Sequence, residues 1–362
     1  MFAFALFTAT ALIAYVVTRL SIWFSEARRL VDIPNHRSSH VQPTPRLGGV
    51  GIVVSVLVAL LLLGLRNSLV VASWIPIALS SFAIALLGIV DDLCELTAAR
   101  KFLVQALCGL AVVVSGFRGE FLTLPIIGAV TLGAFLGAAI SFLWMAGFCN
   151  VFNFMDGING ISAGTVIVYS GFLAAMGARL NDAPTMNVCA ALAGSALGFG
   201  ILNFPRARTF MGDAGSLFLG WFLAILAIHV WRDGADPIAI LLLFSVYLFD
   251  SGFTFLRRLR NRENVFQAHR SHLYQRLVRS GMGHPSVTLI YVFCHIVAGS
   301  VALVYWGAGS YVRVLLISGM VLWYSVLALA VARVEQAQLS AKPAELPLAD
   351  EAGATAHCVR AK

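Results

Sequence analysis

Two adjacent aspartates, Asp91 and Asp92, follow a long apolar stretch of the chain. They stand at the end of a predicted helix, where the helix dipole disfavours carboxylates. A partly buried acidic pair at such a place needs a cation, either Mg²⁺ or a nearby Lys or Arg. Neighbouring residues on a helix point about 100° apart. We therefore expect one carboxylate on a metal and the other beside it; the alternative is a solvated start of a loop.

Two further aspartates, Asp156 and Asp213, stand in the glycine-containing segments MDGING and MGDAGS. Each lies just ahead of a predicted helix, where Asp is a common N-terminal cap. A helix N-terminus also binds phosphate through its free N–H groups, and glycines let a ligand approach the backbone. With the acidic pair these residues supply the oxygen ligands of Mg²⁺, which usually combines few protein carboxylates with substrate phosphates. Capping and phosphate binding both stay open here.

A basic segment, QAHRSHLYQRL, places His269 and His272 three residues apart, with Arg270 between them and Arg276 after them. Residues at this spacing share a helix face. Such a face suits a pyrophosphate better than a metal, because two histidines without carboxylates make a poor metal site. For the neighbouring arginines, the alternative is attraction to anionic lipid headgroups.

Long apolar blocks must position these residues. The chain has 362 residues, of which 59% are hydrophobic and 12% charged, whereas soluble domains carry roughly 25% charged residues. A helix needs about 20 mostly apolar residues to span a bilayer. The sequence predicts an all-α, polytopic transmembrane bundle of about eleven spans: 2–24, 47–65, 70–90, 102–117, 124–149, 161–178, 185–203, 215–231, 237–256, 286–305 and 312–333.

The basic residues predict the orientation of the bundle. With a periplasmic N-terminus and a cytoplasmic C-terminus, the cytoplasmic face collects 20 of the 25 Lys and Arg residues, as the positive-inside rule requires. The other face then carries Arg66, Arg118, Arg179, Arg232 and Arg313. This split explains the net charge of +8 without nucleic acid as a partner, and it places all the segments described above on the cytoplasmic side of the membrane.

The domain organisation follows from the same blocks. Residues 1–335 form one transmembrane domain with a cytoplasmic active site, and the polar, Ala-rich residues 336–362 are a disordered cytoplasmic tail. The six cysteines are scattered without a CxxC spacing, so a disulfide framework is not indicated.

The order of the polar segments resembles the polyprenyl-phosphate N-acetylaminosugar-1-phosphate transferases, glycosyltransferase family 4. The resemblance rests on PTPRLGG, the DD pair, NVFNFMDGING, NFPRARTFMGDAGS and HRSHLYQRL, and it covers about residues 30–285. This family includes the enzymes that start peptidoglycan, enterobacterial common antigen, O-antigen and teichoic acid linkage units. The HRSHLYQRL segment looks most like the O-antigen-initiating branch, which uses UDP-N-acetylated hexosamines and their 6-deoxy forms.

The resemblance implies roles for individual residues. The expected catalytic residues are Asp91, Asp92, Asp156, Asp213 and His272, with Mg²⁺ (or Mn²⁺ in its place) on Asp213 and Asp92. The expected nucleotide- and phosphate-binding residues are Asn153, Asn159, Asn203, Phe210, Lys101, His269 and Arg270, with Phe210 stacked on uracil. Two departures affect specificity: Asn159 stands where some members carry an Asp, and Leu273-Tyr274-Gln275 replaces the later part of the frequent HLHH string.

The implied partners are undecaprenyl phosphate, a UDP-N-acetylaminosugar and membrane lipid, in a bacterial inner membrane; a homodimer stays open. The reaction would join the lipid phosphate to the sugar 1-phosphate and release UMP. A transporter or lipid flippase is the alternative from another class, and Asp250 is the acidic residue nearest a span interior. A CDP-alcohol phosphotransferase is disfavoured because DGINGIS does not continue as that family's motif requires.

Overall fold

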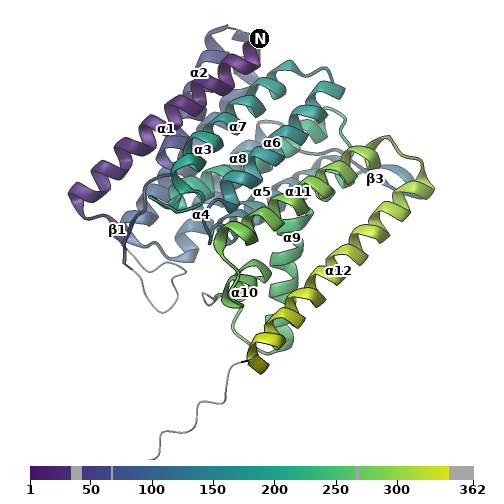
Figure 1. Ribbon diagram of the computed structural model, residues 1–362. Coiled ribbons are helices and arrows are strands. Elements are labelled where there is room, and N and C mark those ends of the chain that lie inside the picture. Colours follow the sequence, from purple (N-terminus) through teal and green to yellow (C-terminus); the bar gives the residue numbers. More distant parts are fainter. Residues whose placement is uncertain (34–42, 67, 266, 268, 342–362) are drawn as a thin grey trace, which may run out of the picture.

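The computed structural model describes residues 1–33, 43–66, 68–265, 267 and 269–341. Within these residues eleven long helices and one short one follow each other along the chain (Figure 1). They are α1 (Phe2–Arg28), α2 (Val50–Arg66), α3 (Ser68–Cys94), α4 (Ala98–Val114), α5 (Gly133–Met155), α6 (Ile161–Arg179), α7 (Ala183–Asn203), α8 (Gly212–Arg232), α9 (Pro237–Arg260), α10 (Leu273–Arg279), α11 (His284–Gly307) and α12 (Ser310–Ala341). The predicted helical membrane bundle is confirmed at this level.

Two short antiparallel ribbons correct the expectation of an all-α chain. Strand β1 (Val31–Asp32) pairs with β2 (Thr44–Pro45), and β3 (Phe121–Leu124) pairs with β4 (Gly128–Thr131). The second ribbon occupies the start of the predicted span 124–149, so that α5 begins only at Gly133. Gly128 and Gly133 have φ angles of +88° and +69°, a backbone conformation that favours glycine and interrupts a regular helix.

Nine helices in the described part of the chain are long and apolar enough to cross a membrane, against the eleven spans that the sequence predicts. The two remaining long helices, α2 and α4, have 17 residues each, which is about 26 Å at 1.5 Å per residue. Helix α4 begins earlier than predicted because Thr97 caps it, accepting a hydrogen bond from Arg100 N at 3.4 Å. Helix α12 runs on to Ala341, into the predicted tail, and the rest of that tail lies outside the described residues.

Helix α8 forms the centre of the bundle. Every residue from Ala214 to Trp231 is buried, and α3 and α5 pack along it. Helices α1 and α7 form one flank, and α9 and α11 the other. Helix α12 runs along the outside of the bundle towards α10 (Figure 1) and exposes Leu315, Leu322 and Leu329, as expected for a helix that faces lipid.

The five polar segments that the sequence places on the cytoplasmic side meet at one end of the bundle, which we call the site end. Gly48 N, before α2, donates to Phe210 O before α8 at 3.0 Å. Lys101 reaches Asp213 in α8, and the Tyr274 hydroxyl of α10 donates to Phe154 O at the end of α5. The prediction that these segments share one face of the protein is therefore confirmed.

Candidate active site

The last turn of α3 carries Asp91 and ends in a tight connection to α4. Asp91 Oδ1 accepts a hydrogen bond from Leu96 N at 2.6 Å, and Asp91 Oδ2 lies 2.7 Å from Lys101 Nζ. The carboxylate is 9% exposed. One side chain thus closes the α3–α4 turn and pairs with a cation, as the sequence predicts for a partly buried acid at a helix C-terminus.

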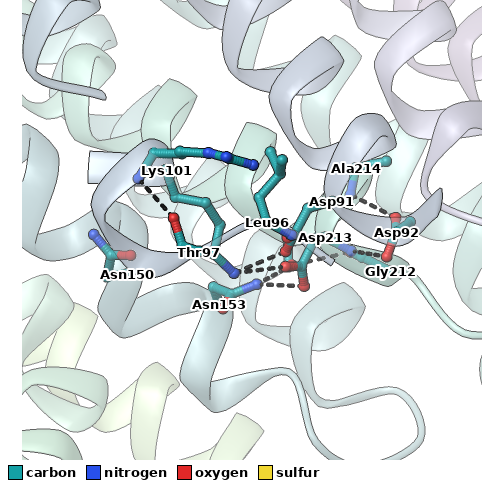
Figure 2. Close-up of polar contacts among 12 residues, drawn as sticks. Asp91, Asp92, Leu96, Thr97, Lys101, Asn150, Asn153, Gly212, Asp213 and Ala214 are labelled. Carbon is teal, nitrogen blue, oxygen red and sulfur yellow. Dashed lines mark hydrogen bonds and ion pairs between the residues drawn. The ribbon is translucent and has the colours of Figure 1, made fainter. Parts of the chain in front are cut away.

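Asp92 points away from Asp91, towards the start of α8 (Figure 2). Its two oxygens accept hydrogen bonds from Asp213 N at 2.9 Å and Ala214 N at 3.0 Å. These backbone groups belong to the first turn of α8, where N–H donors lack partners within the helix and the dipole favours a negative charge. The two carboxylates therefore contact different groups, and which of them holds a metal stays a prediction.

Gly212 allows this close approach. Its φ of +68° favours glycine, and a Cβ atom there would lie 2.4 Å from Arg46 O and 2.6 Å from Asp92 Oδ2. Both distances are far below van der Waals contact. A side chain at this position would push Asp92 away from the N-terminus of α8.

Asp213 sits in the first turn of α8 and connects three elements. Its Oδ1 accepts a hydrogen bond from Asn153 Nδ2 of α5 at 2.9 Å, and its Oδ2 lies 3.5 Å from Lys101 Nζ of α4. Asn153 Nδ2 also donates to Ser216 Oγ at 2.8 Å. Figure 2 shows the side chains of Asp91, Lys101, Asn153 and Asp213 directed towards one another.

The capping alternative is wrong for both Asp156 and Asp213. The residue at the N-cap of α6 is Gly160, and the one at the N-cap of α8 is Met211. Asp156 instead follows the last residue of α5. Burial raises the pKa of Asp156 to about 6, and the charge of Asp92 adds to this rise.

A polar cavity of about 190 Å³ opens among these side chains. Its lining consists of Arg46, Asp91, Asp92, Glu95, Leu96, Lys101 and Asp213. Four carboxylates against two basic groups give a formal charge of −4 + 2 = −2. Carboxylate oxygens are the ligands that Mg²⁺ prefers, and one divalent cation balances this charge. The residues present therefore fit a magnesium ion.

Two charged residues of this cavity, Arg46 and Glu95, are not among the site residues predicted from the sequence. Arg46 belongs to the PTPRLGG segment, whose position next to the DD pair only the fold reveals. Glu95 lies just beyond the end of α3, with a φ of +48°, so helical spacing could not have placed it beside Asp91.

Three of the residues predicted to bind nucleotide or phosphate connect the loops of the site end. Asn203 Oδ1 accepts from Gly160 N at 2.6 Å, and its Nδ2 donates to Thr209 O at 2.9 Å. Asn159 Nδ2 donates to Pro205 O at 3.2 Å. Phe210 is half-buried, and its backbone N–H donates to Pro45 O at 2.8 Å. These contacts join the segments around Asp156 and Asp213; a role in nucleotide binding stays a prediction.

The predicted basic residues form a second group beside α10. His272 Nδ1 lies 3.2 Å from Asp250 Oδ1, and the rings of His269 and His272 are 5.0 Å apart. Burial lowers the pKa of His269 to about 4, and His272 and Arg258 contribute in the same direction. His269 is therefore uncharged at neutral pH. Arg270 Nε and Nη2 are buried without a hydrogen-bond partner among the described residues, which leaves them able to bind an anion.

Comparisons with known proteins identify the family. The family model described as Glycosyl transferase family 4 matches residues 74–231. The probable undecaprenyl-phosphate N-acetylglucosaminyl 1-phosphate transferase of Bacillus subtilis (strain 168) is 30% identical over 266 residues, which cover 72% of this chain and 74% of that protein. The chain belongs to glycosyltransferase family 4.

Two other relatives show how widely the similarity extends. The decaprenyl-phosphate N-acetylglucosaminephosphotransferase of Mycobacterium tuberculosis (strain ATCC 25618 / H37Rv) is 30% identical over 80% of this chain and 79% of its own length. The phospho-N-acetylmuramoyl-pentapeptide-transferase of Lacticaseibacillus paracasei is 29% identical over 59% of this chain and 68% of its own. The resemblance read from the motifs is thus confirmed.

The residues matched by the family model include one part of the site and leave out another. Residues 74–231 include the whole carboxylate group from Asp91 to Asp213, whereas α10 and its histidines lie beyond them. The α10 group is nevertheless joined to the matched part, because the Tyr274 hydroxyl donates to Phe154 O at 3.1 Å. In this member of glycosyltransferase family 4, the two groups are parts of one site end.

Proposed function

We propose that the protein transfers an N-acetylaminosugar 1-phosphate from a UDP-sugar to undecaprenyl phosphate and releases UMP. The observation that carries this proposal is the cavity with a formal charge of −2 among Asp91, Asp92 and Asp213, in a helical bundle of this family. Relatives named as polyprenyl-phosphate N-acetylglucosamine-1-phosphate transferases support the reaction class.

Asp91 and Asp213 hold Mg²⁺ in this proposal, and Mn²⁺ can replace it. The sequence predicts Asp92 and Asp213 as the metal pair, whereas the contacts favour Asp91 beside Asp213. Asp92 already accepts two backbone N–H groups of α8, while Asp91 and Asp213 both face Lys101 Nζ. When bound, the metal would neutralise phosphate charge and align the two substrates.

The chain's own groups then have separate tasks. Lys101 and Arg46 offset the negative charge that two phosphorylated substrates bring together. Asn153 holds Asp213 in place through a 2.9 Å hydrogen bond. The second pKa of a phosphate monoester is near 6, so the lipid phosphate is mostly ionised at neutral pH and attacks without a strong base. Direct attack requires no covalent intermediate on Asp91, which this proposal uses with Asp213 to hold the metal beside Lys101.

The site end faces the cytoplasm of a bacterial inner membrane in this proposal. The support is the excess of basic residues on that side of the chain. UDP-sugars and the phosphate of the lipid carrier would then meet at the headgroup level of the inner leaflet. The homodimer stays a prediction.

The sugar is an N-acetylated hexosamine of the UDP-GlcNAc, UDP-QuiNAc or UDP-FucNAc type, and the product would start an O-antigen or a related surface polysaccharide. The support is the HRSHLYQRL segment and its departures from the HLHH string. Arg270, with buried guanidinium nitrogens that lack a partner among the described residues, is a candidate contact for the sugar phosphate.

The test is exchange of radiolabelled UMP into UDP-sugar by the purified protein, with undecaprenyl phosphate, Mg²⁺ and a panel of UDP-N-acetylhexosamines. One pyrophosphate linkage replaces another, so the reaction runs in both directions and exchange reports the chemistry. We expect exchange that depends on lipid and Mg²⁺, that EDTA abolishes, and that falls at least about 10³-fold in Asp213→Asn.

The matched control for Asp213→Asn is Asp233→Asn, at the opposite end of α8. It changes the same side-chain type far from the cavity and should retain exchange. Absence of exchange with every sugar, in wild-type protein that is monodisperse and folded, would overturn the transferase proposal and favour a transporter.

A further inference from the structure

A buried acidic side chain lies in α9, outside the carboxylate cavity. Asp250 is 1% exposed and belongs to a helix that is long and apolar enough to span the membrane. Ionisable residues in such helices are costly, and they mark either a transport path or a paired structural role. The partners of Asp250 decide between these two.

Hydrogen-bond donors surround the Asp250 carboxylate. They are Thr254 Oγ1 at 3.3 Å, His272 Nδ1 at 3.2 Å, Leu273 N at 2.8 Å, Tyr274 N at 3.2 Å and Tyr291 OH at 2.5 Å. An ionised carboxylate offers about four lone-pair positions. Asp250 is therefore saturated by α9, α10 and α11, and it has no position left for a transported ion. This removes the feature that most favoured a transporter.

The contact with His272 determines which ring nitrogen is free. A ring nitrogen that faces a carboxylate acceptor carries the proton, so Nδ1 of His272 is the N–H group. The ring is 6% exposed and stacks beside Tyr274, with 5.9 Å between the ring centroids. With Nδ1 facing Asp250, Nε2 is the ring nitrogen directed away from this carboxylate and the one that can meet a ligand.

The same carboxylate fixes α10 itself. Its oxygens accept the N–H groups of Leu273 and Tyr274, the first two residues of α10. Tyr274 then extends from this turn to Phe154 O at the end of α5, between Asn153 and Asp156 in the sequence. The position of α10 relative to the carboxylate cavity thus depends on an anchor in α9.

We propose that Asp250 is a positioning residue, which anchors α10 and orients His272 so that Nε2 meets a phosphate oxygen of the substrates. The catalytic part of this inference rests on the proposed transferase function. The departure from the HLHH string fits it, because Tyr274 and Gln275 are engaged in holding α10. Gln275 Oε1 accepts from His272 N at 3.2 Å, and Gln275 Nε2 donates to Tyr274 OH at 3.1 Å.

The kinetic test uses Asp250→Asn in the full-length protein. An amide keeps the size of the side chain but loses one acceptor and the negative charge. We expect the turnover number of exchange to fall about 10–100-fold, the usual cost of losing a partner that orients a functional histidine, with KM for the UDP-sugar changed less than about threefold. Tyr291→Phe is the matched control: it removes a donor to the same carboxylate without touching His272, and it should retain most of the turnover.

A double-mutant cycle separates positioning from a general loss of structure. If Asp250 acts through His272, Asp250→Asn should lower turnover less than about twofold in a His272→Gln background, because contacting residues that act together are not additive. Full additivity of the two changes, or normal turnover in folded Asp250→Asn, would overturn the catalytic part of the proposal.

Hydrogen exchange tests the anchoring part without any enzymatic assay. In Asp250→Asn the amide protons of Leu273 and Tyr274 should exchange at least about tenfold faster than in wild type, while those in the centre of α8 keep their protection. Unchanged exchange in α10 would refute the anchor. Wild-type protein that lacks UMP exchange would instead refute the transferase and with it the catalytic part, whatever the amide protons show.

Discussion

The carboxylate cavity and the α10 group lie at the same end of the bundle but are built in opposite ways. In the cavity, Asp91 and Asp213 share the Lys101 ammonium, and the lining keeps a formal charge of −2. Beside α10, Asp250 is saturated by hydrogen bonds from neighbouring elements and from its own helix. The first arrangement leaves negative charge that a cation can balance, whereas the second leaves no carboxylate lone pair open to a cation.

This difference shows that an aspartate can either take part in the chemistry or hold the structure in place, depending on its hydrogen-bond donors. An aspartate whose donors do not satisfy it, in a cavity with other carboxylates, is suited to a metal and phosphates. An aspartate with a full set of donors is suited to holding a backbone turn and a histidine ring. Asp92 combines both features: it lines the cavity, and its oxygens hold a backbone turn by accepting two N–H groups of α8.

Among the variants that test this comparison, a change at Lys101 should lower UMP exchange most. Lys101→Met removes the ammonium between two carboxylates and changes the formal charge of the cavity lining from −2 to −3. We expect UMP exchange to fall about 10²-fold, as for the loss of one positioned charge at a phosphate site, and Lys101→Arg to restore only part of it. The measurement is the turnover number at saturating Mg²⁺ and UDP-sugar.

Arg100→Met is the matched control for Lys101→Met. Arg100 is the preceding residue, is exposed, and does not line the cavity. Its replacement removes the same charge from the same helix and should cost less than about threefold. Equal losses in the two variants would show that the general positive charge of this segment matters and that the Lys101 contacts do not.

The next largest effect is expected on stability, when Asp92 is replaced. Asp92→Ala leaves the N–H groups of Asp213 and Ala214 without their acceptor at the start of α8, which should lower the free energy of unfolding by about 1–2 kcal/mol. Thermal denaturation in detergent measures this change. Glu95→Ala, from the same cavity but without these backbone contacts, should shift the midpoint much less. A smaller shift for Asp92→Ala than for Glu95→Ala would contradict the assigned role of Asp92 as a cap.

Much of this fold could be predicted from the sequence, because membrane helices appear there as long apolar stretches. Long apolar blocks and the excess of basic residues on one face are local properties of the chain. The ribbon β3–β4 was harder to predict, since its residues are apolar enough to extend the predicted span. Two glycines with positive φ, Gly128 and Gly133, interrupt the helix there.

The site was only partly predictable, for a physical reason. The types and order of Asp91, Asp156 and Asp213 indicate metal and phosphate chemistry in the sequence itself. Which carboxylate caps α8 and which faces Lys101 depends on how α3 and α8 cross, and no local pattern encodes that crossing. Likewise Asp250 reads as an isolated acid in a span, until α9, α10 and α11 bring its donors together.

The smallest expected effect tests the link between the two regions. Tyr274→Phe removes the hydroxyl that donates to Phe154 O at 3.1 Å and accepts from Gln275 Nε2, but it keeps the ring and its stacking on His272. Loss of this buried hydrogen bond should lower the free energy of unfolding by about 1 kcal/mol and UMP exchange by less than about fivefold. Tyr311→Phe, whose exposed ring lies at the start of α12, is the control and should change neither. A loss of exchange in Tyr274→Phe as large as in Lys101→Met would erase the contrast between the regions, because the α10 group would then contribute a hydroxyl to the chemistry itself.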